Sequence, residues 1–141
     1  MTDYKEFTFG WIGISFVLPV QILLVYLFVH NIGDRPLDLN GLIFASLVIL
    51  IVEVLFYGLT TRITLDMILV SFGIGLIRKK IDLKRIKAVR AVETPWYYGW
   101  GIRIIPNGLL YNISGTAGVE LKFKDTNRRF IIGTKKPLAL K

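Results

Sequence analysis

The 141-residue sequence contains no cysteine and a single histidine, His30. Without cysteine the protein has no disulfide, no thiol nucleophile and no thiolate ligand for a metal. One histidine also argues against a histidine-built metal site. The acidic residues are dispersed, no Walker-A loop is present, and no nucleophile lies in a recognisable pattern with a base. We therefore expect no enzyme activity, no cofactor and no metal.

Charge is missing from one long stretch, since residues 7–33 contain no Asp, Glu, Lys or Arg. A second apolar run, residues 41–59, carries one charge, Glu53. About 20 apolar residues suffice to cross a bilayer as a helix. A signal peptide is disfavoured because residues 1–6 are not basic and no small-residue cleavage site follows Val29. The sequence predicts a transmembrane hairpin, residues 1–59, with helices at about 7–30 and 41–59.

The net charge of +8 is divided unevenly. Residues 1–59 hold two basic and five acidic residues, a net charge of −3, and residues 60–141 hold sixteen and five, a net charge of +11. Two crossings place both termini on one side, and the positive-inside rule makes that side cytoplasmic. We expect a multi-pass protein of the inner or cytoplasmic membrane, with a partner of negative charge.

From Arg62 onward the pattern changes to alternation: Ile63, Leu65, Met67 and Leu69 predict a strand with one buried face. A glycine turn at 71–75 precedes a strand at 76–81, and spacing by three at 83–89 indicates a short helical turn. Strand 87–93 ends before Pro95. Asn107-Gly108 predicts a hairpin.

Further along, Val119, Leu121 and Phe123 alternate with Glu120, Lys122 and Lys124, and a turn at 125–127 leads into strand 128–133. About seven strands at hairpin spacing predict a small antiparallel barrel or sandwich over residues 60–141.

Segments 63–89, 97–123 and 128–137 together resemble bacterial pleckstrin-homology-like (PH-like) domains, whose membrane members carry a helical hairpin ahead of the domain. The shared features are the hydrophobic strand, glycine turn and basic strand, the Ile86–Val89 step, the block Gly99-Trp100-Gly101-Ile102-Arg103 and the closing Ile132-Gly133-Thr134.

The resemblance implies a bent seven-stranded antiparallel sheet or barrel closed by a C-terminal helix. This chain departs there, because residues 137–141 make barely one turn. Either the C-terminal helix is short or absent, or something else covers the open end, a neighbouring subunit or the membrane. Such domains are mostly binding and assembly modules that often oligomerise, and no catalytic residues come with the resemblance.

Glu53 is the most conspicuous single residue, because a carboxylate at membrane depth costs several kcal/mol unless it is paired or protonated. Helical spacing places Ser46, Glu53 and Tyr57 on one stripe, with Ser15 at similar depth and Gln21 deeper. A polar contact between helices or subunits is one interpretation. The alternatives are a carboxyl that reaches toward Arg62, and an ion or proton path.

Basic residues follow the second helix closely, and each contributes about 1 kcal/mol when it lies near an anionic leaflet. The alternatives are a solvated strand face and, less favoured, nucleic acid. The candidate lipid contacts are Arg78, Lys79, Lys80, Lys84, Arg85, Lys87 and Arg90.

An aromatic segment, Trp96, Tyr97, Tyr98 and Trp100, is typical of a loop that dips into the headgroup layer, or of core packing or a subunit contact. Taken together, the sequence predicts a membrane-anchored, non-enzymatic scaffold that binds membrane lipid, forms a homo-oligomer and has a possible protein partner. No nucleic acid or small-molecule substrate is expected. The alternative is a small channel or transporter subunit with Glu53 on an ion or proton path.

Overall fold

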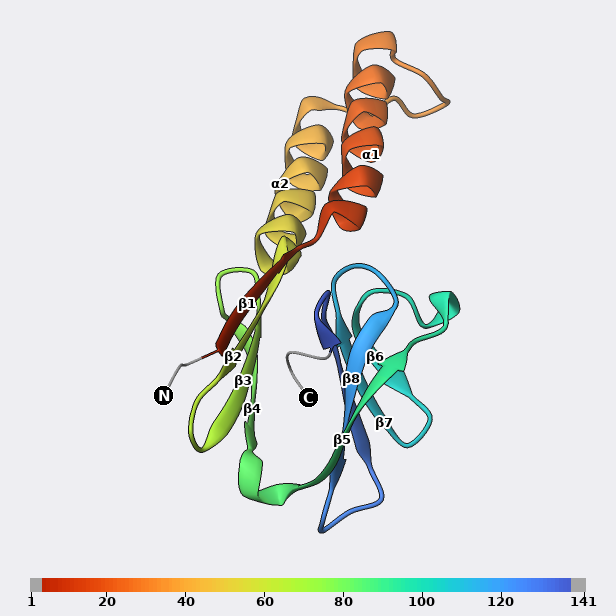
Figure 1. Cartoon of the computed structure of the whole chain (residues 1–141). Helices are drawn as coiled ribbons and strands as arrows, with labels where there is room; N and C mark the ends of the chain where they lie inside the picture. Colours follow the sequence, from red (N-terminus) through yellow and green to blue (C-terminus); the bar gives the residue numbers. More distant parts are fainter. Residues whose placement is uncertain (1–3, 138–141) are drawn as a thin grey trace.

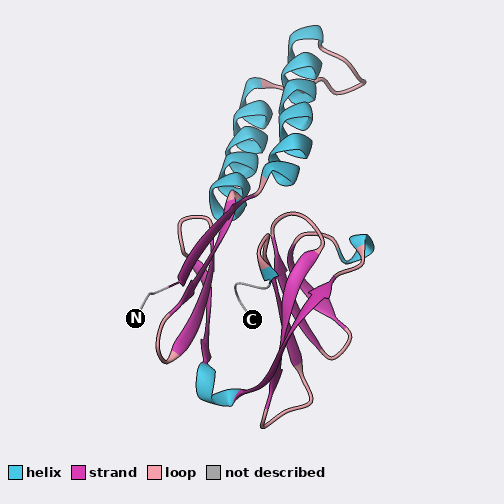
Figure 2. Ribbon diagram, in the orientation of Figure 1, coloured by secondary structure: helices cyan, strands magenta, loops and turns pink. Residues whose placement is uncertain are grey.

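The computed structural model describes residues 4–137 and consists of a helical hairpin mounted on two β-sheets (Figures 1 and 2). The helices are α1 (Trp11–His30) and α2 (Leu39–Phe56), with short 3₁₀ turns at Leu83–Arg85 and Trp96–Tyr98. The strands are β1 (Tyr4–Phe9), β2 (Gly58–Ile63), β3 (Met67–Phe72), β4 (Ile77–Asp82), β5 (Ile86–Glu93), β6 (Gly101–Ile105), β7 (Gly108–Asn112), β8 (Ala117–Phe123) and β9 (Arg129–Gly133).

Both helices are long and apolar enough to span a membrane. Neither contains a buried residue, which separates them from the core helices of a soluble protein. Pro19 lies inside α1, and α2 begins where the Asp38 side chain accepts a hydrogen bond from the Gly41 N–H. The predicted hairpin of apolar helices is therefore present, although α1 begins at Trp11 and α2 ends at Phe56.

Strand β1 was not predicted, because its residues were assigned to the hairpin. It pairs antiparallel with β2 from Tyr4↔Ile63 to Phe9↔Gly58, so the helical hairpin is inserted between two neighbouring strands. A single residue joins each strand to its helix, and the Gly10 N–H donates to the Tyr57 carbonyl at 2.8 Å. The sheet thus includes residues on both sides of the helical hairpin, whereas the expected division assigned all of residues 1–59 to the hairpin.

One sheet has the order β1-β2-β3-β4 and the other β5-β8-β9-β7-β6. Their facing sides form the main core, which comprises Leu59, Ile68, Val70, Phe72, Ile81, Tyr111, Ile113, Val119, Leu121, Phe130 and Ile132. The expected alternation from Ile63 to Leu69 is wrong in phase. A turn separates β2 from β3 there, Leu65 and Met67 are exposed, and the inward residues of β3 are Ile68, Val70 and Phe72.

The described chain has nine strands instead of about seven, and β7 pairs parallel with β9, so the five-stranded sheet is mixed and not purely antiparallel. The other turns were predicted correctly: the 3₁₀ turn after β4, the end of β5 before Pro95, and the β6–β7 hairpin, where Asn107 has φ 64°. The short C-terminal segment was predicted at residues 137–141, of which 138–141 lie outside the described part of the chain.

An aromatic chain connects α2 to this core. The ring of Phe56, the last residue of α2, lies 5.3 Å from Phe72, which lies 5.3 Å from Tyr111, which lies 4.9 Å from Phe130. Such tilted pairs contribute about 0.5–1.5 kcal/mol each beyond area burial. The hairpin is therefore attached to the sheets by β1, β2 and packed aromatic rings.

Candidate functional site at the helix-proximal end

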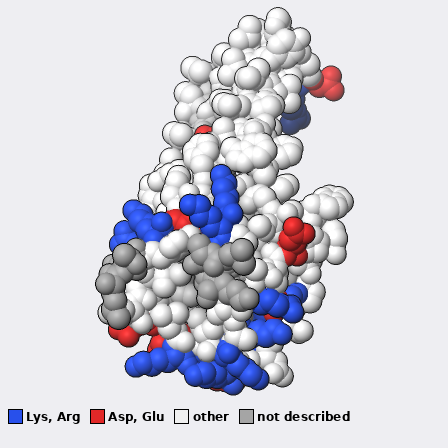
Figure 3. Space-filling view, in the orientation of Figure 1, with Lys and Arg blue, Asp and Glu red and all other residues white. Residues whose placement is uncertain are grey.

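The two ends of the β-domain differ in chemistry. We call the end that adjoins the helices helix-proximal, and the end with the β2–β3 and β8–β9 turns helix-distal (Figure 1). Lys and Arg gather over the β-domain, whereas the visible face of the helices is almost uncharged (Figure 3). The basic residues that are concentrated in the second part of the sequence are thus also concentrated in one part of the structure, the β-domain.

The helix-proximal end carries an exposed apolar rim, defined as Ile74 and Leu76 in the β3–β4 turn with Trp96 and Tyr97 in the second 3₁₀ turn. Their exposed fractions are 60% for Ile74, 72% for Leu76, 77% for Trp96 and 68% for Tyr97. The rim consists of two exposed apolar pairs, in turns that lie on opposite sides of the β-domain at this end (Figure 1). The predicted aromatic segment is divided, because Tyr98 packs on a small core of Ile105, Leu110 and Ile131, and Trp100 is half-buried.

Close packing holds the β3–β4 turn against α2. Gly73 has φ 51°, and a Cβ there would overlap the carbonyl oxygens of Val54 and Leu55. The Gly73 N–H also donates to the Gly58 carbonyl at 2.8 Å. Ile74 and Leu76 are therefore fixed level with the last turn of α2.

A groove of about 420 Å³ runs between the start of α1 and β6. Its wall is apolar, with one basic residue, Arg103, whose Nε donates to the Trp100 carbonyl at 3.0 Å. Trp100 in turn donates from Nε1 to the Gly115 carbonyl at 3.3 Å. The groove therefore places an apolar wall beside one guanidinium. The lining residues are Ile12, Gly13, Phe16, Phe56, Trp100, Gly101, Ile102, Arg103 and Ile113.

The predicted basic tract is not gathered at this end. Only Arg78, near the start of β4, lies toward the helices, while Lys84, Arg85 and Lys87 lie at the helix-distal end. Strands rise about 3.3 Å per residue, so the length of β4 places Lys84 and Arg85, which follow it, beyond a Debye length of about 8–10 Å from its first residue. Lys79 and Lys80 line a separate cleft, and Arg90 pairs with Glu120.

Of the predicted polar residues in the hairpin, the structure joins Gln21 and Ser46: Gln21 Nε2 donates to Ser46 Oγ at 2.8 Å. Ser15 donates to the Trp11 carbonyl of its own helix. Glu53 is half-buried in the last turn of α2, and within residues 4–137 it has no hydrogen bond or ion pair. The polar contact between the helices is therefore made by Gln21 and Ser46, without Glu53 or Ser15.

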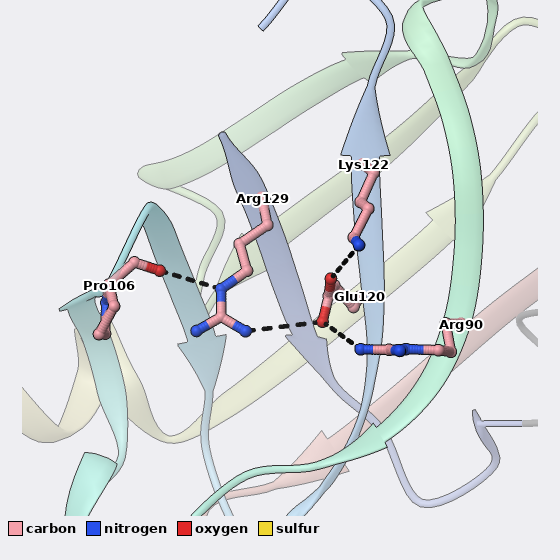
Figure 4. Close-up of polar contacts among 5 residues, drawn as sticks. All are labelled: Arg90, Pro106, Glu120, Lys122 and Arg129. Atoms are coloured by element: carbon pink, nitrogen blue, oxygen red, sulfur yellow. Dashed lines mark hydrogen bonds and ion pairs between the residues drawn. The ribbon is translucent and has the colours of Figure 1, made fainter. Parts of the chain in front are cut away.

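Glu120 alternates with the core residues Val119 and Leu121 as predicted, but its side chain is buried on the other face of the sheet, at 3% exposed (Figure 4). Its carboxylate lies 3.4 Å from Arg90, 3.6 Å from Arg129 and 3.8 Å from Lys122. Arg129 Nε also donates to the Pro106 carbonyl at 3.0 Å. This cluster ties β5, β8, β9 and the β6–β7 turn together on the second face of the five-stranded sheet, and so has a structural role.

Glu6 on β1 connects the two sheets. Its carboxylate accepts hydrogen bonds from the Tyr4 hydroxyl at 3.0 Å, from the Thr134 hydroxyl and from the Lys135 N–H at 3.0 Å. Burial, then the hydrogen bond and charge of Glu6, raise the pKa of the Tyr4 phenol above its usual value near 10.0. The clamp holds the first strand to the segment that follows the last.

Ile74, Leu76 and Arg103 were missed as site residues. Exposed Ile and Leu beside a glycine turn carried a usable signal, because a turn normally contains polar residues. For Arg103 the sequence held no such signal, since its groove forms only when β6 folds against α1. No family model, no curated protein and no solved structure matches this chain.

Proposed function

We propose that the protein is a membrane-anchored, non-enzymatic interaction module whose β-domain is held against the cytoplasmic face of the membrane. The insertion of the helical hairpin between β1 and β2 is the observation that carries the proposal. With one residue at each joint, the β-domain has no flexible tether and keeps one end toward the bilayer. The resemblance to PH-like domains supports a binding or assembly role.

The apolar rim is then seated in the headgroup layer, where Trp and Tyr side chains are favoured. The Arg103 groove takes an acyl chain of an anionic lipid, with its headgroup on the guanidinium. Binding of anionic phospholipid by the full chain, measured by native mass spectrometry, is expected to weaken in Arg103→Gln. Lys84→Gln removes the same charge at the helix-distal end and is expected to bind as the wild type does. Equal weakening in both variants would refute a specific groove.

Self-association is the second part of the proposal, and Glu53 supports it as a carboxyl at the foot of the hairpin that a second copy can approach. The protein component of the detergent-solubilised particle is expected to be a multiple of the 16.1 kDa chain mass. Glu53→Gln is expected to lower that multiple, whereas Ser15→Ala, whose hydroxyl bonds within its own helix, leaves it unchanged. A monomeric wild-type particle would contradict self-association while leaving the lipid test standing.

A channel or transporter subunit with Glu53 on an ion or proton path is the competing proposal. Glu53 lies in the last turn of α2, and deeper in the hairpin Gln21 and Ser46 hydrogen-bond each other. That arrangement favours a structural hairpin. Proton flux through proteoliposomes that is abolished by Glu53→Gln would reverse the preference.

A further inference from the structure

A large cleft lies at the helix-distal end, opposite the candidate lipid site. It has a volume of about 810 Å³, within the range of small-molecule pockets. Three segments distant in the sequence form it: β4 with the turn that follows, the β6–β7 hairpin, and the β8–β9 turn. The lining residues are Lys79, Lys80, Ile81, Arg85, Ile104, Ile105, Asn107, Gly108, Leu109, Phe123, Thr126, Asn127, Arg128, Arg129 and Phe130.

Five of these residues are basic, and within residues 4–137 no acidic residue lines the cleft. Arg85 pairs with Asp125 at 2.9 Å and Arg129 with Glu120, so those two charges are compensated. Lys79, Lys80 and Arg128 have no acidic partner in the described part of the chain. A cleft lined by charge of one sign concentrates counter-ions, so it favours a ligand with several negative charges.

The strand register places the Lys79 side chain in the cleft. Lys79 pairs with Val70 on the inner side of its sheet, between Ile77 and Ile81, so its side chain lies where the core opens at the β4 edge. The inner wall is apolar and aromatic: Phe130 belongs to the main core, Leu109 packs against it, and the Arg85 guanidinium lies 5.6 Å from the Phe123 ring centre. Asn107, Thr126 and Asn127 add hydrogen-bonding groups.

We propose that this cleft binds a soluble organic polyphosphate, with the phosphates on Lys79 and Arg128 and a ring on the apolar wall. Phosphate oxygens accept charge-assisted hydrogen bonds from Lys and Arg, and aromatic side chains take a ring by stacking. A lipid is disfavoured as the source because β4 and its neighbours separate the cleft from the helices. The inference depends on neither self-association nor the Arg103 groove.

The test uses the full chain in nonionic detergent at low ionic strength, with ATP and inorganic tripolyphosphate as probes in isothermal titration calorimetry. ATP is expected to bind more tightly than tripolyphosphate, and added salt is expected to weaken both. Lys79→Gln/Arg128→Gln should weaken ATP at least about tenfold, because each lost charged hydrogen bond is worth about a factor of ten or more. Arg62→Gln/Arg78→Gln removes two charges outside the cleft and should bind as the wild type does.

Absence of binding by both probes would overturn the proposal, as would equal weakening in the two double variants. ATP no tighter than tripolyphosphate would overturn the role given to the apolar wall. A third arm adds phosphatidylglycerol to the micelles. Phosphatidylglycerol binding that Lys79→Gln/Arg128→Gln weakens and Arg103→Gln does not, with neither soluble probe bound, would identify a lipid headgroup as the ligand of this cleft and overturn the soluble source.

Discussion

Replacing Glu6 with alanine removes the clamp between β1 and the segment after β9. The carboxylate loses three hydrogen bonds, from Tyr4, Thr134 and Lys135. A hydrogen bond to a charged group contributes about 1.5–3 kcal/mol when buried, and Glu6 is half-buried, so we take about 1 kcal/mol for each. The β-domain should lose about 2–3 kcal/mol of unfolding free energy.

The assay is urea unfolding in mild detergent of the full chain carrying Trp11→Phe, so that the fluorescence comes from Trp96 and Trp100. Lys5→Ala is the matched control, because Lys5 is exposed on the same strand and should change stability by less than about 0.5 kcal/mol. A Glu6→Ala variant as stable as Lys5→Ala would refute the clamp.

Tyr4 gives the same prediction a second readout. Its raised pKa means that folding favours the neutral phenol, so this stabilisation is full below about pH 10 and is lost as the pH rises through the folded-state value. In Glu6→Ala the pKa of Tyr4 should fall but stay above its usual value, because burial is the largest cause of the shift. Tyrosinate absorbance near pH 10, compared with a Tyr4→Phe variant, measures this change.

Two further substitutions test the packing of the β3–β4 turn against α2 and the buried Glu120 carboxylate. Gly73→Ala should destabilise the β-domain by well over about 1 kcal/mol, because it adds overlap with the Val54 and Leu55 carbonyls to the cost of a positive φ. Gly75→Ala, at φ 92° with no atom within 4 Å, incurs only the backbone cost, and equal losses in urea unfolding would contradict the close approach to α2. Glu120→Gln should cost about 1–2 kcal/mol, less than a fully buried pair, because Arg90 and Lys122 are 68% and 56% exposed and regain water. Lys122→Gln should cost less than about 0.5 kcal/mol, and a larger loss than in Glu120→Gln would refute the assignment of the buried charge to Glu120.

The sequence predicted the hairpin well because uninterrupted apolar length is a local property. It predicted the turns at Gly73, Pro95 and Asn107 for the same reason, since each depends on backbone preferences of one or two residues. Strand β1 was not predicted because its second half, residues 7–9, merges into the apolar run, and only its pairing with β2 distinguishes it.

The alternation was misplaced because Leu65, an apolar residue in a turn, falls in the same two-residue spacing as Ile63 and Met67. Burial of Glu120 and the parallel pairing of β7 with β9 depend on contacts between distant segments. The cleft and the Arg103 groove are also formed by distant segments, so a local sequence pattern could not predict them. The basic tract was recognised as a cluster in sequence, but β4 spreads it along the length of the β-domain.

The orientation of the β-domain at the membrane is the central claim, and the absence of native cysteine allows it to be measured with single spin labels. Leu76 and Leu65 are matched sites, exposed leucines in turns at the helix-proximal and helix-distal ends, at 72% and 66%. In nanodiscs, power saturation should find a label at Leu76→Cys more accessible to oxygen than to a water-soluble nickel chelate, and a label at Leu65→Cys the reverse. Equal aqueous accessibility at both sites would contradict a β-domain seated on the bilayer by its apolar rim.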